Sequence, residues 1–155
     1  MPLKTNRLCI ATVIFGALLS FAAHADAFDV TDTDGKRHRL ADYKGRWVVV
    51  NFWATWCAPC VKEIPEIAEF ARTHKDVVVI GIALDIEEGV DKTKAFAKKV
   101  GHDYPLVLED PSIEKQFGKV KGLPVTKVYD PAAKKIYDRL GTVSKKFLEE
   151  TTKQK

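Results

Sequence analysis

The sequence predicts an α/β fold in which helices pack on both sides of a mixed central sheet. Trp47–Trp53, with one polar break at Asn51, and Val77–Leu84 are apolar runs, as expected of strands that are covered on both faces. Ala58–Thr73 and Asp91–Val100, which follow these runs, carry apolar residues at helical spacing. Strands that alternate with helices, followed by a pair of strands and a last helix, are typical of this architecture.

The first element of the domain is predicted to be a β-hairpin. Phe28–Val30 and Arg37–Leu40 flank Asp34-Gly35, a dipeptide that favours a tight turn between two strands. Asp42–Gly45 is expected to form a second turn, which leads into the buried strand at Trp47–Trp53.

The second half of the chain supplies shorter elements, which complete one domain without repeats or linkers. Gly101 is expected to end the helix at Asp91–Val100. Ser144 is expected to cap the closing helix. The remaining predictions are a strand at Tyr104–Leu108, a helix at Ser112–Phe117, paired strands at Val125–Tyr129 and Lys135–Leu140, and a helix at Ser144–Thr151.

The N-terminus has the pattern of a secretory signal peptide. Lys4 and Arg7 precede the apolar run Leu8–Phe21, and Ala23-His24-Ala25 gives the small-x-small pattern of a cleavage site. An uncleaved membrane anchor is the alternative, although the apolar run is shorter than the ~20 residues that span a bilayer. The pattern therefore predicts a signal peptide over residues 1–25.

Cleavage would leave residues 26–155 as a single domain in the periplasm or another exported compartment. Cys9 would be lost with the leader, and two cysteines are too few for a disulfide-stapled scaffold. Without Lys4 and Arg7 the formal net charge falls from +4 to about +2. Such a weak balance implies neither nucleic acid nor a membrane surface as a partner.

Trp56-Cys57-Ala58-Pro59-Cys60 is the motif that carries the chemistry. Residues three apart share one helical face, so the two sulfurs can close a small ring. The first cysteine falls at a helix N-terminus, where unpaired N–H groups and the helix dipole favour its thiolate. Cys57 is therefore the expected nucleophile and Cys60 the resolving partner in thiol–disulfide exchange.

Two other interpretations of the motif are half of a zinc site and a static disulfide. No cysteine follows Cys60, and His74 and His102 are isolated, so the other zinc ligands lack paired spacing. A ring of this size constrains the unfolded chain little, so the disulfide would stabilise the fold only slightly. Redox chemistry is the favoured interpretation.

Two segments resemble the thioredoxin superfamily. Asn51–Cys60 is similar to its active-site segment, and Gly122–Thr126 is similar to the loop that carries its cis-proline. The signal peptide, the extra helix and strand between Leu84 and Pro111, and Lys62-Glu63-Ile64-Pro65 resemble the exported TlpA/ResA-like branch. The resemblance implies a thioredoxin fold with an N-terminal hairpin and a central helix–strand insertion.

The cis-proline loop implied by the resemblance gives Leu123 and Pro124 a substrate-binding role, and Trp56 and Trp53 are expected to line the site. A cis bond before Pro124 would hold the backbone of Leu123 against the cysteines, with its N–H and C=O free to pair with a substrate strand. From the residues alone, an ordinary trans proline at the start of a strand remains the alternative. Core packing remains the alternative for Trp56 and, more strongly, for Trp53.

Glu63 is the third candidate catalytic residue. It lies one helical turn after Cys60, where a carboxylate would raise the thiol pKa by like-charge repulsion and could accept the thiol proton. By resemblance it matches an acidic residue of the TlpA/ResA-like branch. Asn51 stands where cytoplasmic-type thioredoxins usually have a buried aspartate, which leaves Glu63 as the proton acceptor. A solvated helix glutamate is the alternative.

The sequence thus predicts an exported thiol–disulfide oxidoreductase that reduces protein disulfides. The resemblance implies a role of the cytochrome c maturation type, with a protein disulfide such as that of apocytochrome c as substrate and a membrane-borne thiol as electron donor. No cofactor is expected. The alternatives are a disulfide-donating oxidase, a copper metallochaperone that uses the two sulfurs with His102 as a vague third ligand, and a pure interaction domain.

Overall fold

The computed structural model describes residues 27–85, 87 and 89–153. The predicted signal peptide lies outside these ranges, and within them no helix is both long and apolar enough to cross a bilayer. In chain order the elements are β1 (Asp29–Thr31), β2 (Arg37–Arg39), the 3₁₀ helix η1 (Leu40–Tyr43), β3 (Trp47–Trp53), α1 (Ala58–Thr73), β4 (Val77–Ala83), α2 (Val90–Lys99), β5 (Leu106–Leu108), α3 (Pro111–Phe117), β6 (Val125–Tyr129), β7 (Lys135–Leu140) and α4 (Lys145–Thr152).

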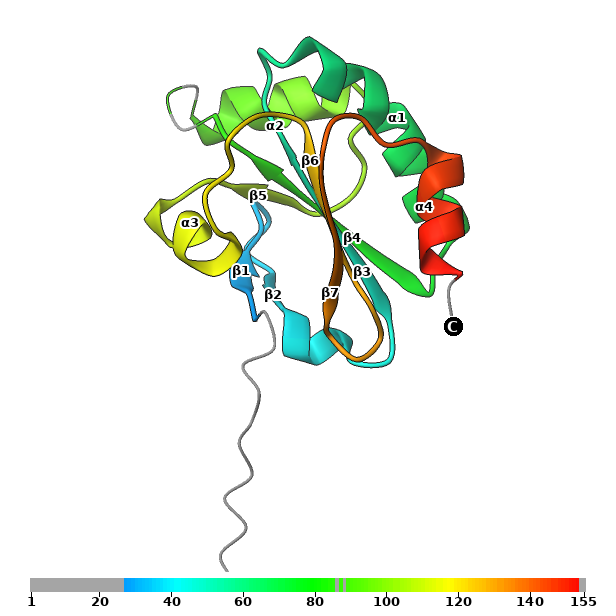
Figure 1. Cartoon of the computed structure of the whole chain (residues 1–155). Coiled ribbons are helices and arrows are strands. Elements are labelled where there is room, and N and C mark those ends of the chain that lie inside the picture. The colour runs from blue at the N-terminus through cyan, green and yellow to red at the C-terminus, as the bar shows by residue number, and fades with distance from the viewer. Residues whose placement is uncertain (1–26, 86, 88, 154–155) are drawn as a thin grey trace, which may run out of the picture.

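The five strands β5-β4-β3-β6-β7, in that order, form one mixed sheet, as predicted (Figure 1). β3 is parallel to β4 and antiparallel to β6, so it is the central strand. The hairpin β1–β2 forms a separate two-stranded sheet. Because β3 and β4 are parallel, their carboxyl ends lie at the same edge of the sheet. This edge carries the chemistry described below.

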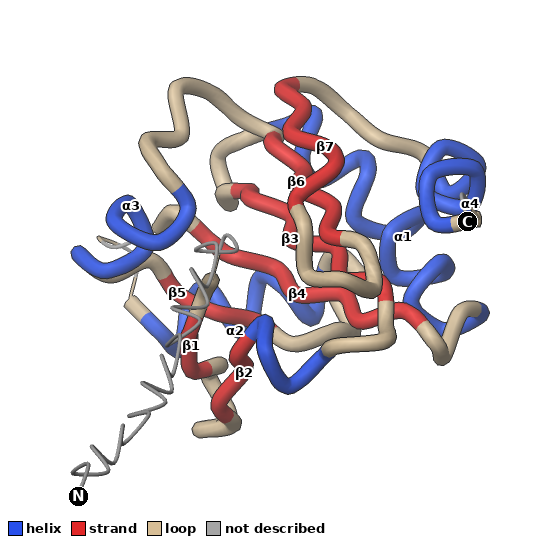
Figure 2. Tube along the Cα trace, turned by 60° about the horizontal axis from the view of Figure 1, so that its bottom comes forward, coloured by secondary structure: helices blue, strands red, loops and turns tan. Residues whose placement is uncertain are grey.

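The helices and the hairpin cover the sheet on both faces (Figure 2). Alternate residues of β3 point to opposite sides, which explains why the strand is apolar almost throughout. Val48, Val50 and Phe52 face α3 and the hairpin, whereas Val49 and Trp53 face α1, α2 and α4. The result is a three-layer molecule with an apolar core on each side of the sheet.

Most predicted elements are confirmed, and two differ. The expected strand at Tyr104–Leu108 begins only at Leu106, because Pro105 has no N–H and joins the sheet only as an acceptor from the Gly81 N–H. The first two residues of the expected turn at Asp42–Gly45 belong to η1, and Gly45 ends the turn with φ of 85°.

Candidate active site

The two cysteines lie where the central strand meets the first helix. Cys57 is the N-cap of α1 and forms a disulfide with Cys60, with the two Cα atoms 5.3 Å apart. The Cys60 N–H also points at the Cys57 Sγ, at 3.3 Å. Cys57 is 5% exposed and Cys60 is fully buried. Cys57 is therefore the more exposed of the two cysteines, and it lies at the positive end of the helix dipole.

The loop before β6 has the expected backbone. The Leu123–Pro124 peptide bond is cis, which confirms the prediction from the resemblance. Pro124 accepts a hydrogen bond from the Gly141 N–H at 2.9 Å, and Leu123 packs against the apolar cluster that contains both cysteines. Leu123 makes no backbone hydrogen bond to another residue of the described chain. Its peptide groups are thus available to an extended segment of another chain.

Glu63 is a buried residue of α1, only 3% exposed, rather than a solvated one. The Asn51 amide donates to Oε1 at 2.8 Å, and the Val143 N–H donates to Oε2 at 2.8 Å. Burial raises the pKa of Glu63 to about 7, against the opposing effect of the hydrogen bonds from Val143 and Asn51. The carboxyl can therefore gain or lose a proton near neutral pH.

The sequence analysis did not identify Asn51 and Val143 as the hydrogen-bond partners of Glu63. Asn51 donates to Glu63 and, more weakly, to the Thr126 hydroxyl at 3.3 Å, so it orients the acid. Val143 contributes only its backbone N–H, which carries no signature of residue type. The position of Asn51 did indicate a buried hydrogen bond, because a buried polar residue in an apolar strand needs a hydrogen-bond partner.

The two tryptophans near the cysteines have opposite environments. Trp53 is fully buried in the cluster that contains Cys57 and Cys60, as its position on β3 predicted. Trp56 is 72% exposed although it directly precedes Cys57. Exposed large aromatic side chains are frequent at protein contact surfaces. The structure therefore leaves Trp56 accessible to a substrate.

A metal site would need ligands beyond the two sulfurs. Across the described part of the chain, no three His, Cys, Asp or Glu side chains are grouped so that they could hold a metal ion. His102 instead packs between Trp53 and Tyr104, with ring centroids 5.4 and 3.8 Å away. Burial lowers the pKa of His102 to about 4, so this imidazole is neutral.

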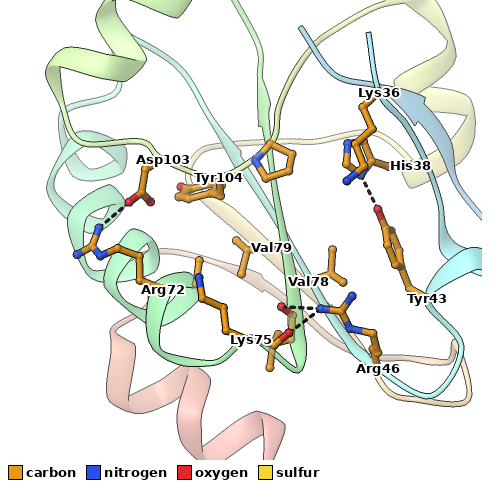
Figure 3. A pocket seen from close by; sticks show the side chains of 13 residues that line it. Lys36, His38, Tyr43, Arg46, Arg72, Lys75, Val78, Val79, Asp103 and Tyr104 are labelled. Carbon is orange, nitrogen blue, oxygen red and sulfur yellow. Dashed lines mark hydrogen bonds and ion pairs between the residues drawn. The ribbon is translucent and has the colours of Figure 1, made fainter. Parts of the chain in front are cut away.

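A cavity of about 290 Å³ lies elsewhere, beside the amino-terminal end of β4 (Figure 3). Its arginines have protein partners: Arg72 pairs with Asp103 at 2.7 Å, and Arg46 donates to the Lys75 carbonyl at 2.9 Å. The disulfide follows the carboxyl end of the parallel strand β3. The cavity and the disulfide are therefore at opposite ends of the sheet.

Comparison with known proteins agrees with this geometry. The sequence profile of the AhpC/TSA family matches residues 22–146. The thiol–disulfide oxidoreductase ResA of Bacillus thuringiensis is 36% identical over 137 residues, which cover 88% of this chain and 79% of that protein. ResA of Bacillus subtilis is 33% identical over 141 residues, which cover 90% of this chain and 79% of the relative.

A solved structure has the same fold. The thiol:disulfide interchange protein of Chlorobium tepidum, described as a thioredoxin family protein, superposes with a TM-score of 0.73 and 30% identity. The match covers 82% of this chain and 91% of that one. With the Cys57–Cys60 disulfide at the strand–helix junction and the cis-proline loop in place, the chain belongs to the AhpC/TSA family of thioredoxin-fold proteins and is a ResA-like thiol–disulfide oxidoreductase.

Proposed function

We propose that this chain is an exported reductase of protein disulfides. The observation that carries the proposal is the disulfide itself, whose outer sulfur belongs to the N-cap residue of α1 and whose inner sulfur is fully buried. This arrangement suits Cys57 for attack on a substrate and Cys60 for the internal step that follows. In the reduced protein both residues carry thiols, and Cys57 loses its proton to react as the thiolate.

The reaction proceeds in two exchanges. The Cys57 thiolate attacks one sulfur of the substrate disulfide, that S–S bond breaks, and the other substrate sulfur leaves as a thiolate that takes a proton. Cys60 then loses its proton and attacks the Cys57 sulfur, and the bond from Cys57 to the substrate breaks, which releases the second substrate sulfur as a thiolate that also takes a proton. The substrate gains two electrons and two protons, and Cys57–Cys60 becomes the disulfide seen in the structure.

Glu63 is the group that accepts the proton of Cys60 in the second exchange. It lies one helical turn after Cys60, it is buried, and its pKa of about 7 suits proton transfer at neutral pH. The negative charge of ionised Glu63 also raises the pKa of the Cys60 thiol by like-charge repulsion. Cys60 therefore keeps its proton until its sulfur attacks.

The substrate binds as an extended strand beside the cis-proline loop. The backbone of Leu123 pairs with it, Pro124 holds that backbone in place, and Trp56 contacts its side chains. The free peptide groups of Leu123 and the exposure of Trp56 support this arrangement.

Export and the partners follow from the sequence rather than from the fold. Residues 1–25 act as a signal peptide, and residues 26–155 work in the periplasm or another exported compartment. A structural neighbour from Streptococcus pneumoniae, with a TM-score of 0.70 and 27% identity, is described as an exposed lipoprotein thioredoxin. By resemblance, a membrane-borne thiol donor recycles the pair, and apocytochrome c is one candidate substrate.

The decisive measurement is the reduction potential of the Cys57–Cys60 pair, by equilibration of residues 26–155 in defined glutathione buffers. A reductase should have a potential near that of thioredoxin, roughly −270 mV. A value near that of DsbA, roughly −120 mV, would contradict the proposal and indicate a disulfide-donating oxidase instead.

Two serine variants test the assigned roles of the sulfurs. Cys60→Ser should accumulate a mixed disulfide through Cys57 with a disulfide-bonded peptide, because the resolving thiol is absent. Cys57→Ser should accumulate little or none. Equal trapping by the two variants, measured by mass spectrometry, would mean that the order of attack is wrong.

A further inference from the structure

A buried carboxylate lies beside the approach to the cysteines. Asp85 is the second residue after β4, which ends at Ala83. Ala83 is opposite Trp53 in the parallel pair β3–β4, and the Leu84 N–H donates to the Trp53 carbonyl at 2.9 Å. Asp85 therefore lies next to the residues that follow Trp53 and lead into Cys57.

Every hydrogen bond that the Asp85 carboxylate accepts within the described chain comes from Thr55. The Thr55 N–H points at both oxygens, at 2.9 and 3.2 Å, and the Thr55 hydroxyl donates to Oδ1 at 3.0 Å. Asp85 is 5% exposed and forms no ion pair with a described cation. Since a buried carboxylate needs hydrogen bonds to offset its lost hydration, these contacts hold Asp85 and Thr55 together.

Thr55 belongs to the turn that presents the outer cysteine. The Ala54 carbonyl accepts a hydrogen bond from the Cys57 N–H at 3.1 Å, which closes the turn on itself. The bonds to Asp85 attach the same turn to the neighbouring strand β4. Cys57 exchanges its sulfur partner during the reaction, whereas this attachment is independent of the sulfurs.

We propose that Asp85 is a positioning residue of the active site, which holds the Ala54–Cys57 turn and shifts the redox balance of the pair toward the disulfide. The shift has a physical reason. Thr55 is two residues from Cys57, so the Asp85 charge lies near the N-terminus of α1, where it opposes the thiolate of the reduced form by like-charge repulsion. It also counteracts part of the favourable helix dipole.

The test is Asp85→Asn, studied by equilibration of residues 26–155 with reduced and oxidised glutathione. Removal of the charge should stabilise the thiolate and increase the equilibrium constant for reduction roughly threefold to tenfold, where tenfold corresponds to about 30 mV. The alkylation rate of Cys57 should also reach its half-maximum at lower pH. Asp76→Asn, the same change at an exposed position before the other end of β4, is the control and should stay within twofold of wild type.

A second pair of variants separates positioning from simple stabilisation. Thr55→Val removes the hydroxyl donor and should shift the equilibrium constant at least twofold, whereas Thr55→Ser keeps the donor and should match wild type. This pair also carries the test if Asp85→Asn fails to fold. The proposal is overturned if Asp85→Asn or Thr55→Val lowers the thermal midpoint of the oxidised and reduced forms equally and leaves the equilibrium constant unchanged.

Discussion

Glu63 combines a hydrophilic side chain with a buried position. Glutamate is rarely buried without a partner, and here an amide and a backbone N–H supply one hydrogen bond to each oxygen. Two hydrogen bonds do not replace full hydration, so the pKa of Glu63 remains raised. Glu66, one turn further along α1, is exposed and accepts from the Lys145 N–H at 2.9 Å.

The raised pKa makes stability depend on pH in a defined window. The Glu63 carboxyl has an ordinary pKa of 4.5 and a pKa of about 7 in the fold. Between these values the folded protein holds a proton that the unfolded chain has released. The free energy of unfolding contributed by Glu63 is therefore fully present below about pH 4.5 and decreases, by about 3 kcal/mol in total, as the pH rises through 7.

Glu63→Gln should remove this contribution. Urea unfolding of the oxidised protein at pH 5 and pH 8 should show a smaller loss of stability at pH 8 in the variant than in wild type. Glu66→Gln is the matched control and should retain the wild-type difference. An identical pH 5 to pH 8 difference in Glu63→Gln and wild type would show that Glu63 does not titrate in this window.

The segment between β7 and α4 connects the two halves of the site. The Gly141 N–H donates to the Pro124 carbonyl, and the Val143 N–H donates to Glu63. Ser144 follows directly and caps α4, with its hydroxyl oxygen accepting from the Phe147 N–H at 3.2 Å. The start of α4 is thus continuous with the backbone that contacts both the acid and the cis-proline.

Loss of the cap should weaken this element measurably. Ser144→Ala leaves the Phe147 N–H without its acceptor and should lower the free energy of unfolding by about 1 kcal/mol. Ser144→Asp keeps an acceptor at the N-cap and should remain close to wild type. Urea unfolding at constant pH measures both, and equal losses in the two variants would mean that the cap is not the cause.

At the scale of the molecule, the packing of the two covering layers on the sheet stabilises the fold. The disulfide contributes little, because it closes only a small ring. All three apolar clusters that contain residues of β3 span several elements, and β3 pairs with a strand on each side. The ring between Cys57 and Cys60 contains few residues, so it restricts the unfolded chain little. A redox enzyme must stay folded in both states, and this distribution of contacts permits it.

Reduction should therefore leave the protein folded. From chain entropy, a ring of this size contributes about 2 kcal/mol, and the free energy of unfolding should decrease by about that amount on reduction. Urea unfolding with and without a non-thiol reductant measures the difference, and a Cys57→Ala/Cys60→Ala double variant should match the reduced wild type. Global unfolding on reduction would show that the disulfide has a structural role.

The elements best predicted from the sequence are those with a strong local pattern. The strand at Trp47–Trp53 and the helix at Ala58–Thr73 have the predicted bounds. Burial on both faces of a strand and helical periodicity each produce a pattern in consecutive residues, so both can be recognised from the local sequence. The strand near Leu106 was predicted too long, since its extent depends on the partner strand β4 and on Pro105.

The sequence by itself determined the fold class, the position of the cysteine pair at a strand–helix junction and, through the resemblance, the cis-proline loop. These features depend on local periodicity and on short motifs. The tertiary structure decided that Glu63 is buried and that Thr55 is bound to Asp85. Glu63 meets Val143, 80 positions away, and Thr55 meets Asp85, 30 positions away. Such contacts exist only after the sheet has paired and the helices have packed on it, so no local pattern records them.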